Sequence, residues 1–342
     1  MSRSKRTLAV VCLTLLTIVA CKDKTKPFKY DLVTRSEAKA FAKKLEKALT
    51  TCTRASMATV YDVDGMMRLV AQGVAKNKRK QLIAGQSQVR LADSCRTATK
   101  AGKAKYLRIT AGAEPRVLIR MIFPDGSFNY VEYFVGKRDG RVVAYDMRSY
   151  SMGRRQTEIA REVFKSLLSD SAGVRGIGLV TEFMRLGKFK KAHVALSMLP
   201  AEVRKSEGVM LWAVSIAAEL DDAKEFTDAL EAFVARFPNN PAADFHGIDR
   251  LIVLKRFKAA LDSIDRIDKR VRGDAYLDVI RASVYSIKGD LAAMASHIRK
   301  ALMREPGVVT KYWEDQLAEY DKQRAARAKP ASPSAAPPKR SD

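Results

Sequence analysis

The stretch YSIKGDLAAMASHIRKALMREP, residues 285–306, decides how the second half of this chain folds. Gly289 interrupts a run of helix-forming residues, and Leu291 and Ile298 then fall on one helical face. The many small residues allow two helices to approach closely, and Pro306 ends the second helix because proline cannot continue it. The stretch therefore predicts two packed helices joined at Gly289.

This spacing resembles the tetratricopeptide repeat, a unit of two helices. The matching positions are Tyr285, Gly289, Leu291, Ile298, Ala301 and Pro306. Parts of the pattern recur earlier, at Ala229, Phe233 and Pro241, at Gly187, Phe189 and Ala192, and at Phe257 and Ala260. We expect three to four degenerate units between about Ile177 and Pro306, unequal in length and with Met294 where the family prefers alanine.

The resemblance implies stacked helical pairs that share a core and leave a concave surface for a peptide or protein partner. Four aromatic residues are candidate anchors in that groove or, at helical spacing, members of the core: Trp212, Trp313, Tyr276 and Tyr312. A helical bundle without a groove is the alternative architecture.

The first half of the chain changes from helical to strand-like patterning. A capping box at Thr34 and Glu37 begins a first helix, which ends near Cys52, and further helical stretches are expected at about 66–75 and 79–99. Four runs rich in β-branched and aromatic residues follow: 106–110, 116–123, 128–135 and 141–150. Turn residues separate them, so we expect an α+β domain with a four-stranded antiparallel sheet. In element order it resembles the cystatin-like roll.

Rolls of this kind often hold a ligand or catalytic pocket in the concave face of the sheet. Tyr145, Asp146, Arg148 and Tyr150 are the candidates for such a pocket here. On a strand, Asp146 and Arg148 point the same way and could instead form an ion pair on a solvated face.

The N-terminus has the pattern of an export signal, with basic residues before an uncharged run, Leu8 to Ala20. At about 1.5 Å per residue this run reaches about 20 Å, short of a bilayer core of about 30 Å. The sequence Ile18-Val19-Ala20-Cys21 resembles the lipobox of bacterial lipoproteins. The resemblance implies that Cys21 becomes the acylated N-terminus and anchors the chain in a lipid bilayer. An ordinary cleaved signal is the alternative.

Lys22 follows this cysteine, where bacterial lipoproteins kept at the inner membrane commonly have aspartate. The resemblance therefore implies the outer membrane. Export also places the remaining thiols, Cys52 and Cys95, in an oxidising compartment, where they could form one disulfide or stay as two separate buried thiols.

The formal net charge is +25, and the basic residues are spread along the chain without the dense aromatic interleaving of a nucleic-acid groove. We expect no nucleic-acid partner. The charge suits either an anionic envelope surface or a face that is merely solvated.

The sequence patterns together divide the chain into five expected segments. They are a signal peptide (1–20), a lipidated linker (21–33), an α+β domain (34–152), a helical repeat domain (153–323) and a disordered tail rich in Ala, Pro and Lys (324–342).

No catalytic motif is present in the sequence. The spacing of the three histidines, His193, His246 and His297, does not match that of metal ligands. A glycine-rich link at 169–178 could be mistaken for a phosphate-binding loop, but such a loop requires a preceding strand and none is expected here. We expect no enzyme activity, cofactor or metal. Two functions remain: a membrane-anchored scaffold whose repeats bind an envelope protein, or a ligand-binding or catalytic pocket in the roll.

Overall fold

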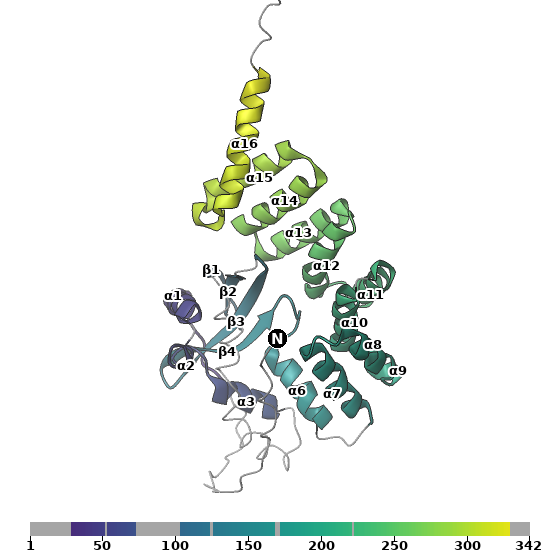
Figure 1. Cartoon of the computed structure of the whole chain (residues 1–342). Helices are drawn as coiled ribbons and strands as arrows, with labels where there is room; N and C mark the ends of the chain where they lie inside the picture. Colours follow the sequence, from purple (N-terminus) through teal and green to yellow (C-terminus); the bar gives the residue numbers. More distant parts are fainter. Residues whose placement is uncertain are drawn as a thin grey trace, which may run out of the picture.

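The computed structural model describes residues 29–51, 53–72, 103–123, 126–167, 172–220 and 222–328. Its element order is a group of helices, then a four-stranded antiparallel sheet, then a long series of helices. This confirms the expected fold class. In Figure 1 the later helices follow one another in a curve, and the sheet lies on the inner side of that curve.

The N-terminal helices are α1 (Arg35–Thr51), the short α2 (Arg54–Ala58) and α3 (Val63–Gln72). The predicted capping box is present, because Glu37 N–H bonds Thr34 Oγ1 at 3.3 Å and Thr34 N–H bonds Glu37 Oε2 at 2.9 Å. Helix α3 starts and ends about three residues earlier than the predicted 66–75, and α2 was not predicted. The helix expected at 79–99 lies outside the described residues.

The sheet is a meander of β1 (Lys103–Thr110), β2 (Arg116–Ile122), β3 (Phe128–Arg138) and β4 (Arg141–Ser149), paired in chain order. One face packs against α1 and α2, in a core that includes Phe41, Leu45, Ile119, Val131 and Tyr133. The sequence located all four strands from their β-branched and aromatic residues and from the turn residues between them.

The helical series begins with α6 (Gln156–Leu167) and continues as consecutive pairs that contact one another. The pairs are α7 (Ala172–Arg185) with α8 (Phe189–Ser197), α10 (Glu207–Glu219) with α11 (Ala223–Arg236), α12 (Ala242–Val253) with α13 (Phe257–Val271), and α14 (Ala275–Lys288) with α15 (Leu291–Arg304). Three further elements are α9 (Ala201–Arg204), η1 (Pro306–Val308) and α16 (Lys311–Ala328). Because α7 begins at Ala172, the expected glycine-rich link at 169–178 is wrong over its described part, which is helical.

The four pairs repeat with a constant period. Buried residues near the start of each second helix stand 34 residues apart, at Ala192, Phe226, Ala260 and Met294. In each first helix the same interval separates Val180, Val214, Ile248 and Ala282, which are also buried. The expectation of unequal units is therefore wrong, and the period equals that of the tetratricopeptide repeat. The period is hard to recognise in the sequence because Phe226 and Met294 are bulky, whereas the tetratricopeptide pattern has alanine at these positions.

Three of the turns inside the pairs share one backbone geometry. Gly187, Lys255 and Gly289 adopt the left-handed conformation, with φ of 66°, 56° and 86°. The next residue in each turn donates its N–H to the carbonyl five residues earlier: Lys188 to Phe183, Arg256 to Leu251 and Asp290 to Tyr285. This turn ends one helix and starts the next at a fixed angle.

The second face of the sheet packs against the inner side of the helical series. Leu118, Tyr130 and Tyr150 from the sheet region share a core with Ile248 of α12 and Ile264 of α13. Phe128 also packs against Tyr276 of α14, with ring centroids 5.4 Å apart. The sheet thus lies between α1 on one face and helices α12 to α14 on the other.

Candidate functional site

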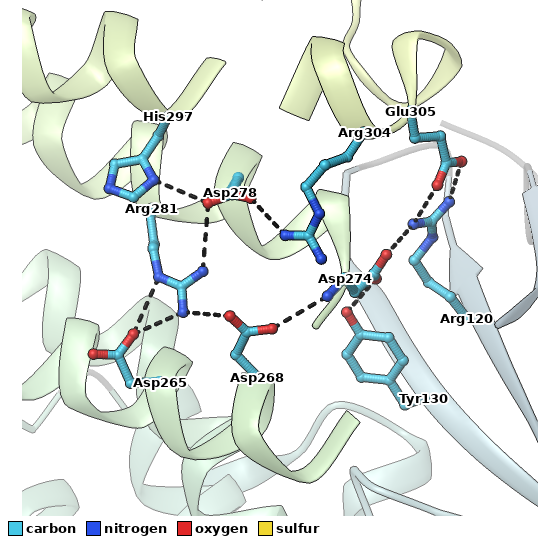
Figure 2. A network of polar contacts seen from close by, with 10 residues as sticks. All are labelled: Arg120, Tyr130, Asp265, Asp268, Asp274, Asp278, Arg281, His297, Arg304 and Glu305. Carbon is cyan, nitrogen blue, oxygen red and sulfur yellow. Dashed lines mark hydrogen bonds and ion pairs between the residues drawn. The ribbon is translucent and has the colours of Figure 1, made fainter. Parts of the chain in front are cut away.

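Charged side chains link the sheet to the last repeat, as Figure 2 shows. Arg120 of β2 donates to Asp274, just before α14, at 2.5 Å, and to both oxygens of Glu305, at 3.2 and 2.7 Å. Tyr130 of β3 donates its hydroxyl to the other oxygen of Asp274 at 2.5 Å. The side chains of Arg120 and Asp274 are only 3% and 2% exposed. This cluster joins strands to helices that lie about 150 residues later in the sequence.

Burial and charge act in opposite directions on the ionisation of these groups. Burial opposes the charged form of Arg120, but its hydrogen bonds to the Glu305 carboxylate and the nearby Asp274 carboxylate outweigh burial and raise the Arg120 pKa. Burial opposes the ionised form of Glu305 as well, yet the bonds from Arg120 and Lys105 hold its pKa below the usual value. Burial, followed by the charge of Asp274, raises the pKa of Tyr130 well above its usual value. The tyrosine therefore stays a neutral donor.

The network continues between the helices of the last two repeats (Figure 2). Arg281 bonds Asp265 at 2.7 Å and Asp268 at 2.8 Å, and it lies 3.6 Å from Asp278. Asp278 in turn accepts from Arg304 at 3.0 Å and contacts His297 Nδ1 at 3.0 Å. Every carboxylate drawn here has a partner within the chain, so the network fixes the sheet and α13 to α15 in place. We assign it a structural role.

The candidate groove anchors are mostly part of the folded core. Tyr276 packs on the sheet, and its hydroxyl donates to the Gly126 carbonyl at 2.6 Å. Trp212 and Trp313 are half-buried against the repeat cores, whereas Tyr312 is 58% exposed. Along α12 to α14 the chain's own sheet therefore fills the concave side where a partner peptide was expected.

The four candidate pocket residues on β4 and its end do not form one site. Asp146 accepts from Thr157 Oγ1 at 2.7 Å, and burial raises its pKa. Arg148 instead bonds Glu132, so the alternative ion pair between Asp146 and Arg148 is wrong. Tyr145 stacks on Tyr30 with centroids 4.3 Å apart. Tyr150 is buried in the core on the repeat side.

A pocket of about 320 Å³ lies between the α1–α2 region and the first face of the sheet. Four methionines line it, together with leucine, valine and aromatic side chains: Met57, Met121, Met147 and Met152. Polar groups on its wall are Tyr61, Asn129, Tyr133, Ser149, Ser151 and Gln156. The expected roll pocket is thus replaced by a largely apolar one on the same sheet face as the α1 core. Sequence reasoning missed its residues because they come from separate chain segments that meet only in the folded sheet.

A second apolar hollow of about 430 Å³ lies on the first repeat, between α7 and α8. We call it the first-repeat groove and define it by Leu179, Phe183, Val194, Met198 and Leu199, with Lys190 and Lys191 at its side. Leu179, Val194 and Met198 are 53%, 50% and 77% exposed. Unlike the concave side near α14, this groove is open in the described structure.

The histidines lie apart from one another. His193 pairs with Glu225 at 2.6 Å, His246 Nε2 contacts the Ser151 carbonyl at 2.8 Å, and His297 stacks on Tyr285. Within the described residues there is no group of His, Cys, Asp and Glu that could hold a metal ion.

The proposed lipid attachment at Cys21 and the proposed disulfide between Cys52 and Cys95 lie outside the described residues. In the part of the chain that the structure describes, no helix combines the length and apolarity needed to cross a membrane. Comparisons with protein-family models, curated proteins and solved structures found no match for this chain.

Proposed function

We propose that this chain is a bacterial envelope lipoprotein that acts as a protein-protein interaction scaffold. Acyl chains on Cys21 hold it in a lipid bilayer, and the repeats present a binding surface to an envelope protein. The sequence order of basic residues, apolar run and Ala20-Cys21 supports the anchor. Lys22 favours the outer membrane.

One observation carries the scaffold role. Helical repeats usually bind through their concave surface, but here the sheet fills that surface along α12 to α14. Among the described residues, the first-repeat groove is an apolar hollow of the array that is open, with three large side chains about half exposed or more. Exposed apolar surface of this kind is typical of an interaction site. The repeats then serve a partner at their N-terminal end.

The chemistry of the groove defines its partner. Leu179, Val194 and Met198 offer an apolar channel between two helices, which suits one face of an amphipathic helix. Lys190 and Lys191 border the channel, so acidic residues beside that face would complement it. We therefore propose an acidic amphipathic helix of an envelope protein as the occupant.

The anchor is tested by replacing the cysteine. Cys21→Ser should move the protein from the membrane fraction to the soluble fraction and abolish palmitate labelling. A variant that still pellets with membranes and still takes up palmitate would contradict the lipid attachment.

The groove is tested by site-specific crosslinking in intact cells. A photo-crosslinking residue at Val194 should capture a defined partner, and the same residue at Met303, which is 78% exposed on α15, should not. Adding Leu179→Glu should abolish capture from Val194, because it places an anion inside the apolar channel. Equal capture from both positions, or capture that survives Leu179→Glu, would refute the assignment.

A further inference from the structure

The pocket between α1, α2 and the sheet has the size and lining of a small-molecule site. Its volume of about 320 Å³ is at the lower end of the range for ligand pockets, which favours one chain or ring system over a two-chain lipid. Methionine side chains are flexible and polarisable, so a wall with Met57, Met121 and Met147 can adapt to an alkyl chain of variable shape.

The lining carries no charge. Each described residue on the pocket wall is apolar or neutral, so an ionised carboxylate or phosphate placed inside would have no counter-ion there. Burial of an unpaired charge is strongly unfavourable. The pocket therefore selects against charged ligands.

A polar cluster on one part of the wall specifies the ligand further. The Asn129 amide donates to Ser149 Oγ at 2.8 Å and to Ser151 Oγ at 3.1 Å, and the two hydroxyl oxygens lie 2.7 Å apart. The two hydroxyl groups hold two hydrogens, and their mutual bond uses one of them. The second hydrogen has no acceptor among the bonds described for this cluster, so the wall can donate to a ligand oxygen.

The second polar pair on the wall is already satisfied. Tyr61 donates its hydroxyl to Gln156 Oε1 at 3.2 Å, and burial raises the Tyr61 pKa well above the usual value. This pair holds α6 beside the pocket, whereas the serine cluster has a spare donor. The Tyr133 hydroxyl is a further polar group on the wall.

We propose that this pocket binds an uncharged single-chain amphiphile, with its alkyl chain among the methionines and a neutral acceptor oxygen, such as an ester carbonyl, at Ser149 and Ser151. The alkyl chain buries apolar surface, and the serine hydroxyl fixes the polar end. Such a ligand belongs to the class of monoacyl esters. The site is separate from the first-repeat groove and does not depend on a protein partner.

The test compares two ligands that share an acyl chain and differ in charge. The full chain carrying Cys21→Ser, which has no acyl group of its own to enter the pocket, is equilibrated by dialysis with radiolabelled monolaurin or laurate at pH 8. We expect saturable binding of one monolaurin per chain and at least about tenfold weaker binding of laurate, since its carboxylate would be buried without a partner.

Three further variants locate the binding. Met147→Trp should fill the pocket and abolish monolaurin binding, while Met303→Trp, on exposed α15, should not change it. The double variant Ser149→Ala and Ser151→Ala should weaken monolaurin about tenfold and leave laurate nearly unchanged. Thermal denaturation of each unliganded variant checks its fold, and the double serine variant keeps the pocket open if Met147→Trp does not fold. The proposal is overturned by an absence of saturable monolaurin binding, by laurate binding equally well, or by affinity that the serine replacements leave unchanged.

Discussion

Arg120 offers the sharpest test of how the sheet is held on the repeats. In the folded chain it is 3% exposed and donates three hydrogen bonds to the carboxylates of Asp274 and Glu305. The change Arg120→Met keeps most of the side-chain volume and removes the cation. Asp274 would then be buried with only the Tyr130 hydroxyl as a side-chain donor, while Glu305 would keep Lys105 at 3.0 Å.

The expected loss of stability follows from this uncompensated charge. Removing one partner of a buried ion pair costs about 3–5 kcal/mol, because the remaining charge has lost its hydration without gaining a counter-ion. The exposed pair of Arg299 and Asp321, whose side chains are 41% and 48% exposed, gives a matched control. Arg299→Met should cost less than about 1 kcal/mol.

Urea denaturation measures both changes without adding salt that would screen the ion pairs. Far-UV circular dichroism follows the whole chain, and the fluorescence of Trp212 and Trp313 follows the repeats. A double variant, Arg120→Met with Asp274→Leu, should recover much of the lost free energy of unfolding, since it also removes the unpaired carboxylate. Equal losses for Arg120→Met and Arg299→Met would refute the view that this ion cluster holds the sheet in place.

Three further predictions concern single positions. The Glu37 carboxylate accepts hydrogen bonds from Lys137 and Thr34, and these bonds lower the pKa of Glu37 to about 2. Carbon-13 NMR should therefore find the Glu37 carboxylate ionised down to that pH. The variant Thr34→Ala should move the Glu37 pKa back toward 4.5. Burial lowers the pKa of His246 below 6.5, so the neutral imidazole contributes to stability above pH 6.5 and this contribution is lost as the pH falls. The variant His246→Gln should therefore show a smaller difference in the free energy of unfolding between pH 7.5 and pH 5.5. An unchanged difference would contradict this. Lys255 and Gly289 both adopt the left-handed conformation, with φ of 56° and 86°, which glycine tolerates better than other residues. Lys255→Gly should therefore raise the free energy of unfolding by up to about 1 kcal/mol, and Gly289→Ala should lower it by about 1 kcal/mol.

The sequence predicted those parts of the fold that depend on local pattern. The capping box at Thr34 and Glu37 and the four strands needed only neighbouring residues, and both are present. The equal length of the repeats was hidden, since Phe226 and Met294 take positions where the pattern asks for a small residue. Lys255 similarly takes a turn position where glycine is usual.

The sites depended on contacts that local pattern does not encode. Asp274 stands at the N-cap position of α14, yet its side chain makes no cap bond and faces Arg120 and Tyr130 instead. Its partner on β2 stands 154 positions earlier. The serine cluster of the pocket was missed for the same reason, because Asn129 and Ser151 belong to different chain segments and meet only once β3 and β4 pair.

The position of the sheet changes how the repeats can work. A concave surface left free would bind its partner at the first helices of each pair, where Ile248 and Tyr276 lie. Here both residues pack against the chain's own sheet, and the ion cluster at Arg120 secures that contact. A partner at this surface would have to displace a buried core and a buried ion pair, and that cost would be subtracted from the free energy of binding. Binding at the first-repeat groove would require no such displacement, and for that reason we propose that groove as the partner's site.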